Sequence, residues 1–299
     1  MDLWIPVTVA AALFQTLRFM LQKALSVSSL SATGATFARF VYSAPLILMG
    51  LGLWFWITGT DLPETNARFW LFASLGGLTQ ILATVFVVLL FRERNFAVGI
   101  TFKNTEVIQT ALVGVILLGE GGSFSALLAM LIGLLAVLIL SKPPDVEGHW
   151  WDHLRSRAVA LGLASGVFFA VSGVSYRGAS LELAADAPLR AAVTLAAVVT
   201  LQTLVMASWM AFFEPGQINA VWRARKRAVF IGFTSMAGSF CWFWAITLQI
   251  AAYVNALGQI ELVFSMAVTL FFFKEKISLR EYLGIGLLAV SIVTLVLVI

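Results

Sequence analysis

The stretch that decides the fold is KNTEVIQTALVGVILLGE, residues 103–120, together with its echo GQIELVFSMAVTLFFFKE, residues 258–275. Each stretch places a glutamate, Glu106 or Glu261, deep in an apolar segment and ends in a second glutamate, Glu120 or Glu275. A carboxylate within a lipid-spanning helix costs at least about 2–3 kcal/mol, so it usually faces a cavity and serves a function. Its appearance twice at one spacing indicates a duplicated membrane protein with a polar site near the middle of the bilayer.

The composition makes the lipid bilayer the solvent of this chain. Of 299 residues, 61% are hydrophobic and 11% are charged, and the mean hydropathy is +0.96. Soluble domains carry about 25% charged residues, so a water-soluble fold is excluded. The first apolar stretch, residues 3–20, has no basic leader and no small-residue cleavage site, which favours a retained helix over a signal peptide.

Several classes of chemistry have no sequence support. Cys241 is the only cysteine, which excludes an internal disulfide, and the two histidines, His149 and His153, lie in a polar loop without metal-site spacing. We therefore expect no metal and no cofactor. The net charge of +4 lies in short loops, as is normal at a membrane surface, so we expect no nucleic acid partner. The absence of a Walker A motif argues against direct use of ATP.

About 20 apolar residues are needed to cross the hydrocarbon, and this criterion predicts an all-α integral membrane protein with ten transmembrane helices. The predicted spans are 3–24, 33–57, 69–91, 96–118, 124–141, 157–178, 187–213, 228–249, 251–273 and 279–298. Turn-forming residues separate them, for example at residues 121–123, 143–145 and 214–216.

The spans divide into two five-helix repeats, residues 1–141 and 157–299, joined by a linker at residues 142–156. At one offset of 155 residues, Glu106 matches Glu261 and Glu120 matches Glu275. Because each repeat has an odd number of helices, the second must insert upside down. This predicts the inverted-repeat architecture of secondary transporters.

Each half resembles the EamA-type unit of the drug/metabolite transporter superfamily, over nearly the whole chain. The family signature runs from Asn104-Thr105-Glu106 to Gly119-Glu120 in the first half. It runs from Gln259-Ile260-Glu261 to Lys274-Glu275 in the second. The resemblance implies ten helices, a pocket lined by helices 3, 4, 8 and 9, and movement of small metabolites.

The sequence departs from the family pattern at two points. The usual proline after the first glutamate is replaced by Val107 and Leu262, which favours straighter fourth and ninth helices than the family has. The basic residue that follows the second glutamate is missing in the first half, where Gly121 stands.

The predicted substrate site gathers polar residues of the fourth and ninth spans. Lys103 and Glu106 are three residues apart and share a helix face. Lys103 is expected to hold an anionic group of the substrate, and Glu106 or Glu261 a cationic group or a proton; alternatively, the Lys103–Glu106 pair is purely structural. Asn104, Asn255 and Gln259 lie at comparable depth and complete this set. Two carboxylates that share a cavity also make Glu106 and Glu261 candidates for proton coupling.

Three arginines add positive charge to the predicted spans. Arg18 and Arg39 have no acidic partner nearby in the sequence, whereas Arg190 follows Asp186 by four residues and can pair with it. With Lys103, they outweigh the two glutamates by two charges, which favours an anionic or zwitterionic solute, unless the arginines snorkel to the interface.

Further lining residues are expected on the third and eighth helices. Trp242 and Trp244 can stack on an organic or cationic part of the substrate, or simply face lipid. Gln80 and Thr84 share a face four residues apart, and either line the cavity or bond neighbouring helices.

Basic residues concentrate in the odd-numbered loops, for example at residues 223–227. The positive-inside rule therefore predicts cytoplasmic odd-numbered loops and both termini outside, whereas the family topology has both termini inside. We expect a multi-pass protein of the bacterial inner (cytoplasmic) membrane that is a monomer or a weak homodimer.

The expected function is alternating-access secondary transport of a small polar organic metabolite, amino-acid-like or zwitterionic, by proton coupling or exchange. One alternative is a carrier of organic anions or phosphorylated metabolites held by Lys103, Arg39 and Arg18. An alternative from another class is a membrane enzyme acting on lipid, which would have to use His149 and His153. A scaffold without transport activity would have no need of paired midplane carboxylates.

Overall fold

The computed structural model describes residues 2–28, 30–90, 102–140, 157–264 and 279–299. The described residues form helices and short connections, with no strand among them. The helices of the first half are α1 (Trp4–Ser28), α2 (Ala32–Thr58), α3 (Ala67–Leu90), α5 (Glu106–Leu118) and α6 (Phe124–Leu140). Those of the second half are α8 (Arg157–Leu181), α9 (Ala187–Phe213), α10 (Gln217–Arg223), α11 (Arg225–Leu248), α12 (Ala251–Gly258) and α14 (Leu279–Val298).

The helices form a bundle with an apolar exterior. Six of the described helices, α1, α2, α3, α8, α9 and α11, are long and apolar enough to cross a membrane. Large apolar side chains face outward, with exposed fractions of 82% for Trp56 and 81% for Phe212. Such a surface is stable in hydrocarbon and costly in water, so the chain is an integral, multi-pass membrane protein.

Contacts between the two halves come in matched pairs. Helix α1 packs on α11 as α3 packs on α8, α5 packs on α8 as α12 packs on α1, and α2 packs on α11 as α9 packs on α3. Helices α2 and α9, α5 and α12, and α6 and α14 also pack on one another. Exchanging α1 with α8, α2 with α9, α3 with α11, α5 with α12 and α6 with α14 leaves this contact pattern unchanged.

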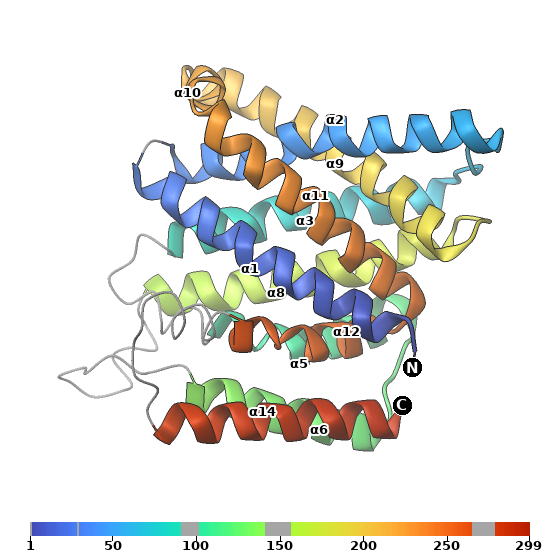
Figure 1. The fold of residues 1–299 in the computed structure, drawn as a ribbon, viewed down its shortest axis with the longest axis vertical. Coiled ribbons are helices and arrows are strands. Elements are labelled where there is room, and N and C mark those ends of the chain that lie inside the picture. Colours follow the sequence, from blue (N-terminus) through green and yellow to red (C-terminus); the bar gives the residue numbers. More distant parts are fainter. Residues whose placement is uncertain (1, 29, 91–101, 141–156, 265–278) are drawn as a thin grey trace.

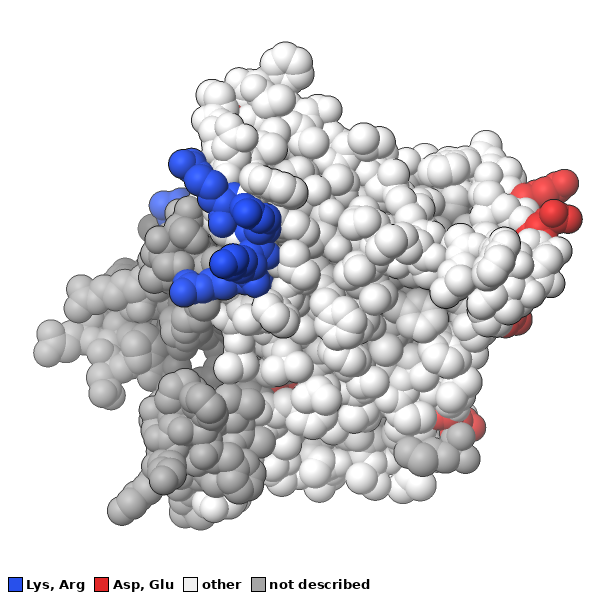
Figure 2. Space-filling view, turned by 45° about the horizontal axis from the view of Figure 1, so that its top comes forward, with Lys and Arg blue, Asp and Glu red and all other residues white. Residues whose placement is uncertain are grey.

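The helices run between two chemically different ends (Figure 1). Both termini lie at one end, here called the terminus end, where α1 begins and α8 finishes. The opposite end carries the cluster of blue side chains in Figure 2, and is here called the basic end. The exposed basic residues there include Arg223, Arg225, Lys226 and Arg227, and Arg157 at the start of α8.

The predicted fourth and ninth spans are not straight helices, which corrects the expectation drawn from the missing prolines. Turns at residues 104–105 and 259–260 break them immediately before Glu106 and Glu261. At both breaks a backbone N–H donates to the carbonyl three residues earlier, as in a 3₁₀ turn. Thr105 N donates to the Phe102 carbonyl at 3.2 Å, and Ile260 N donates to the Leu257 carbonyl at 3.1 Å. The hydroxyl of Thr105 also donates to the Phe102 carbonyl, so at the first break a side chain competes with the backbone for this acceptor.

Two further predictions concern the connections between helices. Helix α10 was not expected, since residues 214–227 were interpreted as a loop; Gly216, at φ 98°, turns the chain into it. The predicted linker at residues 142–156, with His149 and His153, lies outside the described residues, as do residues 96–101 and 265–273 of the fourth and ninth spans.

Candidate functional site

A cavity of about 720 Å³, its opening included, lies inside the bundle between the two halves. It is lined by residues of α1, α2, α3, α5, α8, α11 and α12 and by the two broken segments. The family resemblance implied a lining from the third, fourth, eighth and ninth helices, which are α3, α5, α11 and α12. Helices α1, α2 and α8 also contribute to the lining.

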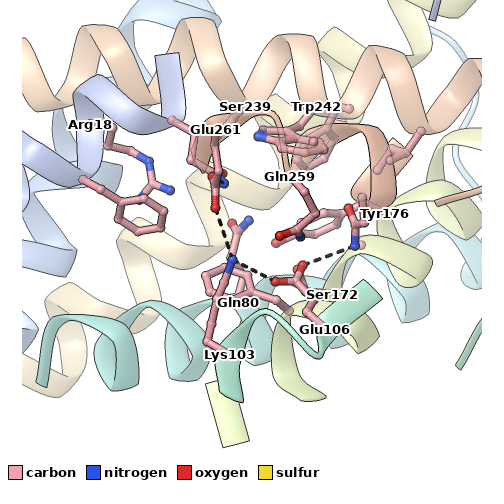
Figure 3. Close-up of a pocket in the computed structure, with 18 of the residues that line it drawn as sticks. Arg18, Gln80, Lys103, Glu106, Ser172, Tyr176, Ser239, Trp242, Gln259 and Glu261 are labelled. Atoms are coloured by element: carbon pink, nitrogen blue, oxygen red, sulfur yellow. Dashed lines mark hydrogen bonds and ion pairs between the residues drawn. The ribbon is translucent and has the colours of Figure 1, made fainter. Parts of the chain in front are cut away.

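Lys103 lies between the two glutamates (Figure 3). Its Nζ is 3.1 Å from Oε2 of Glu106 and 3.8 Å from Oε1 of Glu261. The remaining oxygens accept bonds from amides: Asn255 Nδ2 donates to Glu106 at 3.2 Å, and Gln15 Nε2 donates to Glu261 at 2.6 Å. One cation thus neutralises carboxylates from both halves, and each carboxylate is bonded on both oxygens.

Arg39 lies in the same cavity but is bonded only to hydroxyl groups. Its Nε donates to Ser235 at 3.0 Å, its Nη1 to Thr84 at 3.0 Å and its Nη2 to Ser239 at 3.3 Å. The side chain is buried. These bonds tie α2 to α3 and α11 and hold the guanidinium group in a fixed position.

Arg18 reaches the cavity from α1 (Figure 3). Its Nη1 donates to Gln22 Oε1 at 2.7 Å, and its guanidinium carbon lies 4.2 Å from the centroid of the Phe19 ring. Within the described part of the chain, no carboxylate lies within ion-pair distance of Arg18 or Arg39.

Of the residues predicted to bind substrate, nine line the cavity: Arg18, Arg39, Gln80, Lys103, Glu106, Trp242, Asn255, Gln259 and Glu261. The other three predicted residues are not among its lining. Thr84 is buried behind the cavity as a partner of Arg39. Asn104 is buried at the first helix break, and Trp244 is half-buried on α11. No described residue bonds the side-chain amide of Asn104 or the indole nitrogen of Trp244.

Arg190 does not contribute to the cavity. It lies at the start of α9, where its Nε donates to the Ala185 carbonyl at 2.6 Å. The lining therefore carries three cations, Arg18, Arg39 and Lys103, against two carboxylates, which leaves one excess positive charge rather than the two expected from the sequence.

Sequence reasoning missed the contribution of α8. Phe169, Ser172 and Tyr176 line the cavity, and Tyr176 is also bonded to the Gly76 carbonyl at 2.9 Å. The spacing of Ser172 and Tyr176, four residues apart on one helix face, was an available signal. Gln15 was recognisable in the same way, three residues before Arg18.

A second ion pair joins the halves between the cavity and the terminus end. Arg177 Nε lies 2.9 and 2.7 Å from the two oxygens of Glu120, and its Nη1 donates to the Ile246 carbonyl at 2.7 Å and the Gln249 carbonyl at 3.0 Å. These bonds attach the connection between α5 and α6 to α8 and to the last turn of α11.

Nothing in the described residues suggests a metal centre, since no three His, Cys, Asp or Glu side chains there are grouped to hold an ion. The histidines required by the lipid-enzyme alternative lie outside the described residues.

Comparison with known proteins concerns the fold of the whole chain and the family of its second half. A solved structure described only as "Crystal structure of protein" aligns with a TM-score of 0.66 and 17% sequence identity, covering 97% of this chain and 99% of that chain. At this identity the likeness concerns the fold alone. A comparison with curated proteins gave no match. Residues 156–297 match the EamA-like transporter family. This match identifies the second half of the chain as an EamA-like transporter unit.

Proposed function

We propose that the protein is an alternating-access secondary transporter of a small polar organic metabolite that carries both an anionic and a cationic group, such as an amino acid. The observation that carries this proposal is the position of Lys103 between Glu106 and Glu261 in a cavity between the halves. Charges of both signs face the same space. The two charged groups of a zwitterion can therefore pair with cavity residues that otherwise pair with one another.

The proposed mechanism requires two oppositely inserted five-helix repeats, residues 1–141 and 157–299. Three observations support them: the matched helix contacts, the breaks at equivalent positions before the two glutamates, and the opposite directions of α1 and α8 in Figure 1. Two equivalent packings of such repeats would open the cavity to either side of the membrane in turn. The Arg177–Glu120 pair is then a contact that holds the terminus end closed.

Glu106 and Glu261 are the proposed sites of proton coupling. Only 13% and 14% of their side chains are exposed, so each depends on Lys103 for neutralisation. When substrate or a conformational change draws Lys103 away, uptake of a proton is the remaining way to remove a buried negative charge. When one substrate molecule replaces another in the cavity, the buried negative charge is neutralised again without a proton.

Charge distribution supports an orientation with the basic end in the cytoplasm and both termini outside. Arg223, Arg225, Lys226 and Arg227 are exposed at the basic end. Exposed acidic residues such as Asp61, Glu64 and Asp186 belong to the connections at the terminus end. Cytoplasmic loops carry the excess of lysine and arginine in membrane proteins.

The test is uptake into proteoliposomes containing the purified protein, with labelled amino acids, their decarboxylated amines and organic phosphates, each with and without a pH gradient. We expect uptake of at least one zwitterion above the level of protein-free liposomes, and abolition of that uptake by the double substitution Glu106→Gln and Glu261→Gln. Uptake that the double variant leaves unchanged, in rate and in pH dependence, would remove both carboxylates from the mechanism.

An organic-anion carrier is the second candidate, favoured by the excess positive charge of the cavity lining. The same panel separates the two candidates. A carrier of anions transports organic phosphates and ignores both amines and amino acids.

A further inference from the structure

We propose that Arg18 is the anion-binding residue of the cavity, which takes the carboxylate or phosphoryl group of the solute, and that Lys103 does not. The inference rests on the proposed transport function and deepens it. It also reverses the role that the sequence suggested for Lys103.

Lys103 has no charge to spare for a ligand. Its ammonium group lies between the carboxylates of Glu106 and Glu261, at 3.1 and 3.8 Å. An anion bound there would face two negative groups at close range, and like charges in a buried site repel strongly. Lys103 instead occupies the position that a cationic group of the solute would take.

Arg39 is already committed to the protein. All three of its guanidinium nitrogens donate to hydroxyl groups, those of Ser235, Thr84 and Ser239. These neutral partners orient the group but do not neutralise it. Arg39 therefore adds to the positive potential of the cavity as a fixed charge, and the described residues leave it two N–H donors, where they leave Arg18 four.

Arg18 forms no ion pair with a described residue, although Glu261 attracts it from a longer distance, and the described residues give it fewer hydrogen bonds than Arg39. A guanidinium group has five N–H donors, and the described residues use one of those of Arg18, through Gln22. The residue is 3% exposed, so the free energy cost of keeping its charge out of water is high unless a partner is supplied. Arg18 and Arg39 also repel each other electrostatically. An oxyanion bound at Arg18 satisfies its donors and relieves that repulsion, because guanidinium binds carboxylate and phosphate groups through paired hydrogen bonds.

The neighbourhood of Arg18 also fits the rest of a zwitterion. Glu261 lies between Arg18 and Lys103 in Figure 3, and its contact with Lys103, at 3.8 Å, is the longer of the two. A solute ammonium group can displace Lys103 from Glu261 while the attached carboxylate binds Arg18. This arrangement favours solutes whose opposite charges are close together, as in α-amino acids.

The experiment measures anion binding without transport. Detergent-purified protein is titrated with sodium acetate or with sodium phosphate at constant ionic strength, and the midpoint of thermal unfolding gives the affinity. We expect Arg18→Gln to weaken anion binding on the order of tenfold to a hundredfold, the effect of losing a charged hydrogen bond. Arg18→Lys, which keeps the charge, tests the site if Arg18→Gln does not fold. We expect it to bind the anion more weakly than the wild type and to distinguish acetate from phosphate less, because an ammonium group has no planar fork. The acetate and phosphate arms show which oxyanion the site prefers.

The matched control is Arg68→Gln, which removes an arginine whose side chain is 76% exposed and should leave anion binding unchanged. Wild-type affinity in both Arg18 variants, or loss of anion binding in Lys103→Gln alone, would overturn the assignment. If anion binding depends on Arg18 but no solute is transported, the proposed function fails and the subsite stands. If transport occurs and neither acetate nor phosphate binds, the subsite fails alone.

Discussion

The surroundings of Glu106 and Glu261 show what the two halves have in common and how they differ. Both glutamates follow a helix break at equivalent positions, and both accept a bond from an amide, of Asn255 or of Gln15. They differ in their distance to Lys103, which is 0.7 Å shorter for Glu106, at 3.1 against 3.8 Å. Both segments break at the matched position, but the cation that pairs with both carboxylates belongs to the first half alone.

The residue that matches Lys103 in the second half is Gly258, and the structure shows why it carries no side chain. A Cβ built there would lie 2.3 Å from Cη2 of Trp242. An indole ring from α11 therefore occupies the space that a second lysine would need. At this matched position the first half therefore supplies a lysine to the cavity and the second half leaves room for an aromatic ring.

The largest effect is expected from Lys103→Met, which removes the cation that pairs with both carboxylates and leaves them facing the cavity. Removing one member of a buried ionic cluster costs about 3–5 kcal/mol of folding free energy. The loss should shrink as the pH falls, because the folded variant then takes up a proton that relieves the repulsion and the unfolded chain gains no such relief. Thermal unfolding across a pH series measures both effects.

Lys226→Met is the control, since Lys226 is exposed at the basic end. A Lys103→Met variant that is as stable as this control at every pH would mean that the two carboxylates do not depend on Lys103.

A smaller effect is expected from neutralising one carboxylate at a time. Glu106→Gln removes the shorter ion pair and should cost about 2 kcal/mol, whereas Glu261→Gln should cost about 1 kcal/mol because its contact with Lys103 is longer. In transport, the first substitution should lower the rate at saturating solute more than the second. Glu64→Gln, at an exposed position in the connection between α2 and α3, is the control. Equal costs for the two substitutions would show that the difference in distance has no energetic meaning.

The sequence named most of the charged residues that line the cavity because a buried charge is conspicuous in an apolar segment. Glu106, Glu261 and Lys103 could be named for this reason. The pairing of Lys103 with Glu261 could not, since it joins residues far apart in the chain and depends on how the halves pack. The partners of Arg39 were hidden in the same way, because serines such as Ser235 and Ser239 occur in many membrane helices without a site nearby.

The helix breaks show a different limit. The absence of proline after Glu106 and Glu261 correctly excluded one cause of a kink, but Thr105 supplies another by bonding the Phe102 carbonyl. Hydropathy alone cannot detect such a break, because the segments on both sides of it remain apolar. Helix α10 was not predicted because it is seven residues long and lies in a polar stretch, where hydropathy gives no signal for a helix.

A moderate effect is expected from Gly258→Ala, which tests directly whether the Trp242 ring occupies the space that a side chain at position 258 would need. The new methyl group would overlap the Trp242 ring, and overpacking of this kind costs about 1–3 kcal/mol. Because Trp242 lines the cavity, solute affinity should fall along with stability. Gly173→Ala is the matched control: Gly173 lines the same cavity, and a Cβ there would meet no atom within 4 Å. Equal behaviour of the two variants would mean that the indole ring moves aside freely.

The smallest effect is expected from Trp242→Phe, because the described residues offer its indole nitrogen no hydrogen-bond partner. The substitution keeps an aromatic wall and should cost less than about 1.5 kcal/mol. Its value lies in combination with Gly258→Ala. The smaller ring vacates the position where the new methyl group would overlap Cη2, so the double variant should be destabilised by less than the sum of the single variants. Strict additivity of the two free energies of unfolding would show that Gly258 and Trp242 are not coupled. The absence of a second lysine would then have to be explained by the carboxylates alone.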